Sequence, residues 1–112
     1  MSSSIKLDRG DLVWIDFNPQ AGHEQGGRRP ALTLSPLDYN RKVGLALFCP
    51  ITSRSKGFPF EVPLPDGLGI QGVVMADQVK SFDWQARRPQ RAGRAPDAVV
   101  RQVLAKAASL LA

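Results

Sequence analysis

The sequence has little of the chemistry on which disulfide frameworks, zinc sites and membrane spans depend. It holds one cysteine, Cys49, and one histidine, His23, in 112 residues. A single cysteine excludes an intramolecular disulfide framework, and one His with one Cys falls short of any zinc-finger or zinc-hydrolase ligand set. No apolar run approaches the roughly 18 to 20 residues that a membrane-spanning helix needs. We therefore expect a protein of a reducing compartment with no metal, no cofactor and no contact with a membrane.

The opening residues also lack an export signal. They read MSSSIKLDRGD and contain no apolar core of the kind that a secretory signal peptide carries, so we expect a cytoplasmic protein. A length of 112 residues suits one domain, 1–112, with one modest core. The composition, 43% apolar and 22% charged, is typical of a globular chain.

The charge balance is basic. Lys and Arg outnumber Asp and Glu by 15 to 10, which gives a net charge of +5 and a pI near 10.0. Such a balance favours a polyanionic partner and salt-sensitive binding, although many small proteins are basic for solubility alone. Four arginines cluster without an intervening acid: Arg87, Arg88, Arg91 and Arg94. A run of this kind is more often a solvated loop than a binding site.

The first two-thirds of the chain has the character of short β-strands. Asp11–Phe17 is rich in β-branched and aromatic residues with alternating polarity, which predicts a strand buried on at least one face. Gly44–Pro50 is almost continuously apolar, as in a strand covered on both sides. Residues 37–43 are expected to form a turn, and residues 84–87 to extend the sheet. Further strands are predicted at Pro30–Ser35, Phe60–Leu64, Val73–Ala76 and Val79–Phe82.

The C-terminal segment changes to a helical period. In Pro96–Leu111 the apolar residues recur every three or four positions, as on one face of a helix. Pro96 suits the first helical position, and Asp97 suits the first turn. Five to seven short strands followed by one helix predict a mainly β fold, a small antiparallel barrel with a C-terminal helix.

Two polar loops carry the groups with catalytic potential. Asn18–Arg29 contains His23, Glu24, Gln25, Arg28 and Arg29 between glycines, and the second loop contains Thr52, Ser53, Arg54 and Lys56. If the flanking strands are neighbours, both loops open on the same rim. Guanidinium, ammonium, hydroxyl and carboxylate groups around one groove suit phosphodiester cleavage. The spacing alone leaves open a hydrogen-bonded loop pair with no ligand.

The two most reactive side-chain types have plainer interpretations. Cys49 lies inside an apolar strand with no basic residue nearby in sequence, so we expect a core residue rather than a nucleophile. His23 is a lone histidine in a loop, which is more often solvated than catalytic.

Several segments, in order and spacing, resemble the MazF/PemK/Kid toxins of bacterial toxin–antitoxin modules. The resemblance runs from Gly10 to the C-terminal helix and is close to the MazF branch. The matching segments are GDLVW at 10–14, GHEQGGRRP at 22–30, LSP at 34–36, PITS at 50–53, KGFPFEV at 56–62 and ADQVKS at 76–81. The resemblance implies an SH3-like small antiparallel β-barrel of the CcdB/MazF type that forms a homodimer.

The resemblance also implies an activity. It implies a sequence-specific, ribosome-independent and metal-independent endoribonuclease, an mRNA interferase that cuts single-stranded RNA by 2′-hydroxyl attack. The expected ends are a 2′,3′-cyclic phosphate or 3′-phosphate and a 5′-hydroxyl. ACA-containing sites are the default expectation for the sequence that is cut.

The family pattern implies roles for particular residues. Arg29 and Thr52 match the catalytic pair, and Glu24 matches the carboxylate of the first loop. A guanidinium with a pKa above about 12 is a poor base, so we expect Arg29 to clamp the phosphorane charge and Thr52 to donate a hydrogen bond. Glu24 or His23 would then take the 2′-hydroxyl proton. The positions expected to contact RNA are Gln25, Arg28, Ser53, Lys56, Asp77, Gln78 and Lys80.

One departure from the pattern bears on His23. A histidine before the glutamate resembles the Kid/PemK branch, but Met75 stands where that branch has an arginine. The arrangement of that branch is therefore incomplete, and the MazF-style pair of Arg29 and Thr52 is favoured, with His23 as a secondary candidate.

The resemblance implies partners as well. A MazE-like antitoxin would thread its acidic C-terminal tail across the toxin dimer and cover the RNA groove, and DNA would be reached only through the antitoxin. Two alternatives stay open at this point. A gyrase poison of the CcdB type is disfavoured because such toxins use a terminal Trp-Gly-Ile, whereas this chain ends Ser109-Leu110-Leu111-Ala112. A binding-only RNA module would keep the groove without the cleavage.

Overall fold

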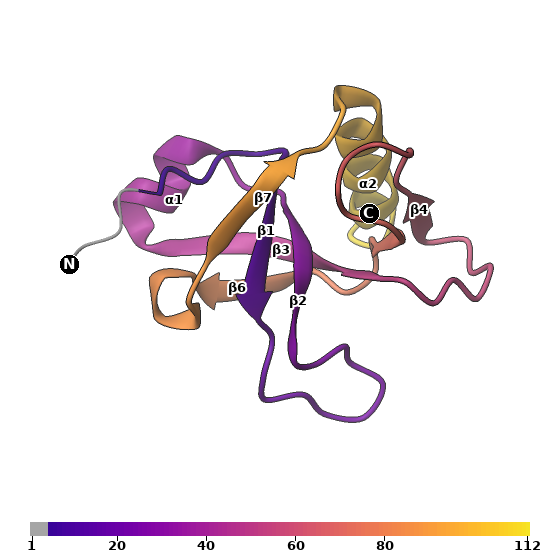
Figure 1. Cartoon of the computed structure of the whole chain (residues 1–112), viewed down its shortest axis with the longest axis horizontal. Coiled ribbons are helices and arrows are strands. Elements are labelled where there is room, and N and C mark those ends of the chain that lie inside the picture. The colour runs from indigo at the N-terminus through magenta and orange to yellow at the C-terminus, as the bar shows by residue number, and fades with distance from the viewer. Residues whose placement is uncertain (1–4) are drawn as a thin grey trace.

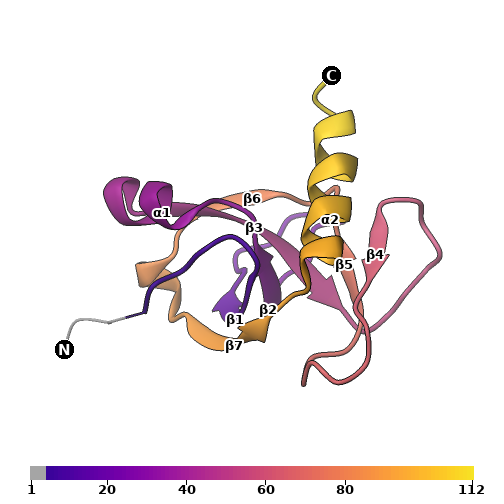
Figure 2. The same cartoon turned by 90° about the horizontal axis from the view of Figure 1, so that it is seen from above.

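A computed structural model describes residues 5–112 as one seven-stranded antiparallel sheet with two α-helices. The strands are β1 Asp11–Asp16, β2 Arg28–Thr33, β3 Leu45–Thr52, β4 Glu61–Pro63, β5 Val73–Met75, β6 Lys80–Asp83 and β7 Gln90–Arg94. Helix α1 is Leu37–Val43, the 3₁₀ helix η1 is Gln85–Arg87, and α2 is Asp97–Ser109. The helices α1 and α2 lie at opposite ends of the sheet (Figures 1 and 2). The predicted mainly antiparallel β fold with a C-terminal helix is confirmed.

The long strand β3 organises the sheet. The strand order is β4-β5-β3-β2-β1-β7, and β6 also pairs with β3. One edge of β3 pairs with β2, while β6 and then β5 pair along the opposite edge, with Phe48 opposite Lys80 and Thr52 opposite Val73. The segments that follow β1 and β3 are thereby brought to the same end of the sheet, and the segment between β5 and β6 lies beside the middle of β3.

Both faces of the central strands are buried, which explains their nearly continuous apolar sequence. On one face Leu12, Leu32 and Ile51 pack with Val100 and Val103 of α2. The other face carries a second cluster. Its members are Leu7, Val13, Ile15, Phe17, Ala31, Ala46, Phe48, Phe82 and Trp84. Burial of the aliphatic and aromatic side chains is the main stabilising contribution, at about 1.5–3 kcal/mol for each large one.

The segment 37–43 is a helix, and the predicted turn there is wrong. The carboxylate of Asp8 accepts a hydrogen bond from the Leu37 N–H (2.9 Å), which satisfies an amide at the helix start. The buried Asn40 amide donates to the carbonyls of Leu7 (2.8 Å) and Ser35 (3.0 Å). Gly44 ends the helix with a positive φ of 80°. These stabilising partners lie outside the segment, so its own composition did not reveal the helix.

Three further expectations near the C-terminus are corrected. Residues 85–87 form η1 rather than an extension of the sheet, because the buried Trp84 indole N–H donates to the Asn40 carbonyl (3.2 Å) and turns the chain. The arginine run is solvent-exposed but is not a loop throughout, because Arg91 and Arg94 lie in strand β7, which was not predicted, and Arg87 lies in η1. Helix α2 begins at Asp97, so Pro96 is its N-cap rather than its first residue. Within residues 5–112 no helix has the length and apolar character needed to cross a bilayer.

Candidate active site

The sheet brings the two polar loops together. Strands β2 and β3 are antiparallel neighbours with Ala31 opposite Pro50, and this register runs on towards Arg29 and Thr52. Arg29 belongs to β2 rather than to the preceding loop, since the strand begins at Arg28. Arg29 at the start of β2 and Thr52 at the end of β3 therefore meet at one end of the sheet. The loop between β1 and β2 projects from this end in Figure 1.

Two adjoining hollows, which we call the loop groove, open between these loops. The first has a volume of about 480 Å³ and is lined by Gln25, Arg29, Thr52, Ser53, Arg54 and Lys56. The second has a volume of about 400 Å³ and shares four of those residues. Its further lining residues are His23, Phe58, Glu61, Met75, Asp77 and Gln78. The lining is rich in hydrogen-bond donors and positive charge, as a phosphate backbone requires.

The Arg29 guanidinium is held with its terminal nitrogens available. Its Nε–H donates to the Gly26 carbonyl (2.8 Å), which fixes the plane of the group. Partial burial lowers the pKa of Arg29 from its usual value. Among the described residues no carboxylate forms an ion pair with it. A fixed, unpaired guanidinium can bind a phosphodiester through two parallel hydrogen bonds.

Thr52 is positioned by its own loop and by a glycine. Its Oγ1 accepts a hydrogen bond from the Arg54 N–H (3.2 Å), which leaves the hydroxyl proton to be donated elsewhere. The backbone of Gly72 packs against the Thr52 carbonyl so closely that an added Cβ would lie 2.3 Å from that oxygen. Thr52 can therefore donate to an oxygen in the groove from a fixed position.

Two contacts tie the first loop to the start of β6 and to the turn before it. The Glu24 carboxylate forms an ion pair with the Lys80 Nζ (2.7 Å) and accepts a hydrogen bond from the Ala21 N–H (3.1 Å). The Lys80 hydrogen bond, with the Ala21 amide, lowers the pKa of the Glu24 carboxyl. The Gln25 N–H donates to the Gln78 Oε1 (2.9 Å). Glu24 and Lys80 thus face each other beside the groove rather than line it.

Two of the predicted RNA-contacting residues do not line the groove: Lys80 pairs with Glu24 beside it, and Arg28 lies in a different hollow. Its guanidinium lies 3.4 Å from the Asp16 carboxylate, in a separate polar hollow lined also by Asn18, Arg87 and Arg88. Side chains alternate along a strand, so Arg28 and Arg29 point to opposite faces.

Four residues of the groove were not among the predicted site residues: Arg54, Phe58, Glu61 and Met75. Arg54 stood in the second polar loop, and its charge was the signal. Phe58 is 53% exposed, which is unusual for a phenylalanine and places an aromatic face at the edge of the groove. Glu61 and Met75 are paired in adjacent strands β4 and β5. Glu61 stands in the matching segment KGFPFEV and Met75 where the Kid/PemK branch has an arginine, but neither was predicted to line the groove.

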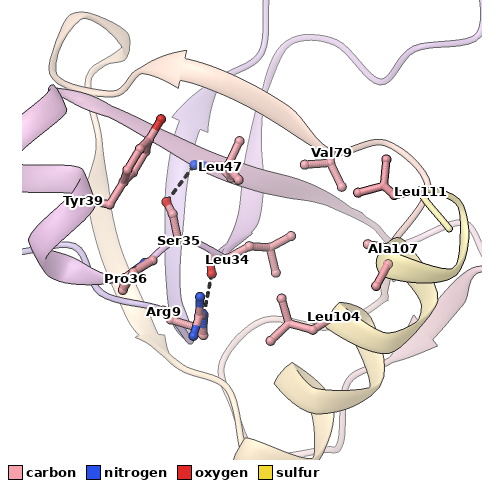
Figure 3. Close-up of a pocket in the computed structure, with 11 residues that line it drawn as sticks. Arg9, Leu34, Ser35, Pro36, Tyr39, Leu47, Val79, Leu104, Ala107 and Leu111 are labelled. Carbon is pink, nitrogen blue, oxygen red and sulfur yellow. Dashed lines mark hydrogen bonds between the residues drawn. The ribbon is translucent and has the colours of Figure 1, made fainter.

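A further hollow has a different character. It has a volume of about 390 Å³ and lies between α2 and the strands β3 and β6, with apolar side chains of Leu34, Leu47, Val79, Leu104 and Leu111 around it (Figure 3). Arg9 lies at its margin, with its Nε–H donated to the Leu34 carbonyl (2.6 Å). This apolar hollow does not suit phosphate, but it suits apolar side chains of another molecule.

A small β-sheet protein whose loops gather a guanidinium, an ammonium and hydroxyl groups at one rim has the groups that proteins use to bind or cleave nucleic acid. The family of PemK-like, MazF-like toxins of type II toxin–antitoxin systems matches residues 8–111. The endoribonuclease toxin MazF of Escherichia coli K12 is 52% identical over 93 residues, which cover 83% of each chain.

Solved structures agree with this match. MazF from Deinococcus radiodurans is 56% identical with a TM-score of 0.93, and the match covers 96% of this chain and 98% of that one. A MazE–MazF complex from the same organism gives 56% identity and a TM-score of 0.87, over 96% and 97% of the two chains. The chain belongs to the MazF/PemK-like toxin family of type II toxin–antitoxin systems, and it is an endoribonuclease. The gyrase-poison alternative is thereby set aside.

Proposed function

We propose that the loop groove cleaves single-stranded RNA by attack of a 2′-hydroxyl on the adjacent phosphorus. The P–O bond to the 5′-oxygen of the next nucleotide breaks, and that oxygen takes a proton from water. The ends are a 2′,3′-cyclic phosphate and a 5′-hydroxyl. The observation that supports this most strongly is that Arg29 and Thr52, on neighbouring strands, line the same hollow.

Arg29 and Thr52 stabilise the charge that develops on the phosphorane. The guanidinium binds the non-bridging oxygens, and the Thr52 hydroxyl donates to one of them. Loss of one such donor typically costs about 3–4 kcal/mol of transition-state stabilisation, or roughly a hundred- to a thousand-fold in rate.

The 2′-hydroxyl proton goes to a base at the edge of the groove, for which Glu24 and His23 were both candidates. His23 lines the groove together with Thr52 and Asp77. Glu24 instead forms an ion pair with Lys80, and this contact makes its carboxylate a weaker base. The arrangement favours His23 as the proton acceptor and gives Glu24 the role of bracing the first loop.

The remaining wall of the groove binds and selects the RNA. Lys56 and Arg54 bring positive charge to the backbone of the strand. Hydrogen-bonding groups suited to base edges come from Gln25, Ser53, Asp77 and Gln78. A single strand can follow such a groove, whereas a duplex hides its base edges. The substrate class we propose is therefore single-stranded RNA, including mRNA, cut at short specific sequences with ACA-containing sites as the default.

A cationic groove that binds RNA also binds an acidic, extended peptide. The related MazF from Deinococcus radiodurans has been solved with MazE. We infer that a MazE-like antitoxin covers the loop groove of this chain with an acidic tail and blocks cleavage, and that both act in the cytoplasm. DNA is then reached only through the antitoxin.

A homodimer is the expected assembly, and the apolar hollow beside α2 supports it. Val79, Tyr39 and Leu111 line this hollow and are 40%, 39% and 89% exposed, which leaves an apolar patch for a second copy to cover (Figure 3). Replacement of Leu111 by Asp would weaken such a dimer, and sedimentation equilibrium measures the change. A wild-type chain that sediments as a monomer at micromolar concentration would count against the dimer.

The function is tested by a cleavage assay in EDTA with a long single-stranded RNA and its DNA copy. Wild type, Arg29→Ala and Thr52→Ala are compared with Arg101→Ala, a matched loss of positive charge on the exposed surface of α2. We expect discrete cuts in RNA only, with 5′-hydroxyl ends, and a loss of at least a hundred-fold in the two groove variants. RNA bound but left intact by folded wild type, or full activity in both variants, would overturn the proposal.

A further inference from the structure

Glu61 is a buried carboxylate that lines the loop groove without an ion pair in the described part of the chain. It is 9% exposed and begins β4, paired with Met75 of β5. A buried carboxylate must be compensated by hydrogen bonds or opposite charge, because it would otherwise bear a large desolvation cost. The groups that compensate the charge of this carboxylate therefore indicate the role of Glu61.

The carboxylate is compensated by the backbone of the second loop. Its Oε1 accepts hydrogen bonds from the Ser55 hydroxyl (2.7 Å) and the Gly57 N–H (3.2 Å), and its Oε2 accepts one from the Lys56 N–H (2.9 Å). Gly57 has a positive φ of 73°, so the successive amides curve around the carboxylate as they do around a bound anion. These hydrogen bonds lower the pKa of Glu61, the Ser55 hydroxyl being the largest cause.

The second loop has little else to hold its shape. Within the described chain, no backbone–backbone hydrogen bond outside the strands and helices involves residues 53–57. Three of their amides are met by side chains: Thr52 Oγ1 accepts the Arg54 N–H, and the Glu61 carboxylate accepts those of Lys56 and Gly57. The Gly57 N–H also lies 3.4 Å from the Ser55 Oγ. Farther along, Lys106 of α2 donates to the Pro59 carbonyl and secures the other end of the loop.

We propose that Glu61 is a positioning residue of this ribonuclease, whose carboxylate folds residues 53–57 into the wall of the loop groove. It anchors the loop to the rigid β4–β5 pair, and the loop in turn presents the Lys56 ammonium to the RNA. The same geometry places the Arg54 N–H on Thr52 Oγ1, which directs the Thr52 hydroxyl proton into the groove. The inference rests on the proposed catalytic role of Thr52.

The test uses Glu61→Gln, which keeps the size of the side chain but replaces one acceptor oxygen by an N–H₂ donor facing backbone N–H groups. Asp66→Asn, an exposed carboxylate in the turn between β4 and β5, is the matched control for the loss of one negative charge. For each purified variant we would measure kcat and KM on a short RNA, amide hydrogen exchange at Lys56 and Gly57, and thermal unfolding.

We expect Glu61→Gln to fold, to lose at least ten-fold of the protection of the Lys56 and Gly57 amides, and to lose at least ten-fold in kcat with a smaller change in KM. Asp66→Asn should change none of these by more than two-fold. Ser55→Ala removes one donor from the exposed loop without touching the core, so it should give an intermediate loss in kcat even if Glu61→Gln fails to fold. Two outcomes would overturn the inference. The first is a Glu61→Gln variant that loses amide protection but keeps the wild-type kcat, and the second is a Glu61→Gln variant that does not fold while Ser55→Ala keeps the wild-type kcat.

The outcome separates this inference from the proposed site. Full activity in Thr52→Ala would show that Thr52 is not catalytic, whatever Glu61 does to the loop. If Thr52→Ala is inactive while Glu61→Gln is fully active, the proposed catalytic site stands and the positioning role of Glu61 is refuted.

Discussion

Gly72 lies against the residue that we place at the centre of the chemistry. Its φ is +132°, a conformation that residues with a side chain rarely adopt, and a Cβ there would lie 2.3 Å from the Thr52 carbonyl oxygen. Gly93 provides a matched control. Its φ is +137°, but its nearest contact, the Leu68 carbonyl oxygen, would lie 3.8 Å from an added Cβ. An alanine at either position bears the same backbone strain, whereas only Gly72→Ala must displace Thr52.

The magnitudes follow from these distances. Backbone strain of this kind costs about 1–3 kcal/mol in either variant. Overpacking adds about 1–3 kcal/mol in Gly72→Ala alone, which for a chain of this length is about 4–12 °C in the midpoint of unfolding. Ordinary contact begins near 3.4 Å, so the Thr52 carbonyl must move by about 1 Å. A displacement of that size at reacting groups can cost about a hundred-fold in rate.

Thermal unfolding followed by circular dichroism and single-turnover RNA cleavage measure the two effects. We expect Gly72→Ala to unfold at a lower temperature than Gly93→Ala and to cleave RNA at least ten-fold more slowly when both are folded. Gly93→Ala should cleave at the wild-type rate. Equal stability and equal cleavage in the two variants would refute the claim that this contact positions Thr52.

Three further predictions concern single side chains. Arg29→Ala is expected to lower the cleavage rate by roughly a hundred- to a thousand-fold, whereas Arg28→Ala should lower it far less because Arg28 faces Asp16; equal losses in a cleavage assay would contradict the assigned faces. The Glu61 carboxyl has a lowered pKa in the folded state, so its contribution to stability is present above its usual value of 4.5 and is lost as pH falls through the folded value. Urea unfolding should therefore find wild type more stable than Glu61→Gln at pH 6, and the difference should shrink as the pH falls below 4.5 and through the lowered pKa of the folded state. Cys49 is buried and its thiol pKa is raised to about 12, so a thiol reagent at pH 8 should react only after denaturant is added, and rapid reaction of the native protein would show that β3 opens.

Six of the seven strands and the last helix could be predicted because their signals are local, whereas the polar and mostly exposed strand β7 was not predicted. Alternation in Asp11–Phe17 and the helical period of Pro96–Leu111 record which faces are buried, and both elements are confirmed within two residues at each end. Helix α1 could not be predicted in this way. Its stability depends on the Asp8 carboxylate and on the tertiary hydrogen bonds of Asn40, and no window along residues 37–43 contains that information.

The site was predictable where charge or a motif marked it. The sequence indicated two polar loops, and the register of β2 and β3 accounts for their meeting. It did not indicate Glu61, because the segment Phe60–Leu64 reads as a short apolar strand and the partners of the carboxylate are backbone amides. Because every residue except proline carries a backbone N–H, the composition of a segment does not show which amides bind a carboxylate. The sequence also did not show that Arg28 and Arg29 point to opposite faces of the sheet. That follows only once β2 is known to begin at Arg28.

The net charge of +5 is a poor measure of the positive charge that faces RNA in the loop groove. Much of the arginine run serves the fold: Arg91 and Arg94 both lie about 3 Å from the Asp11 carboxylate, which is 2% exposed and needs compensation. Arg87 donates to the Asp16 and Asn18 carbonyls and stacks 3.8 Å above the Phe82 ring, which secures the start of the first loop.

The positive groups that line the loop groove without an ion pair in the described chain are Arg29, Arg54 and Lys56. Charge in this protein is therefore divided between two tasks. Paired arginines on β7 and beside β1 fix the sheet and the base of the first loop, and the unpaired cations at the start of β2 and just after β3 remain for phosphate. Because a phosphate contact releases counterions only where it neutralises an unpaired cation, RNA affinity should follow these three groove residues rather than the total charge.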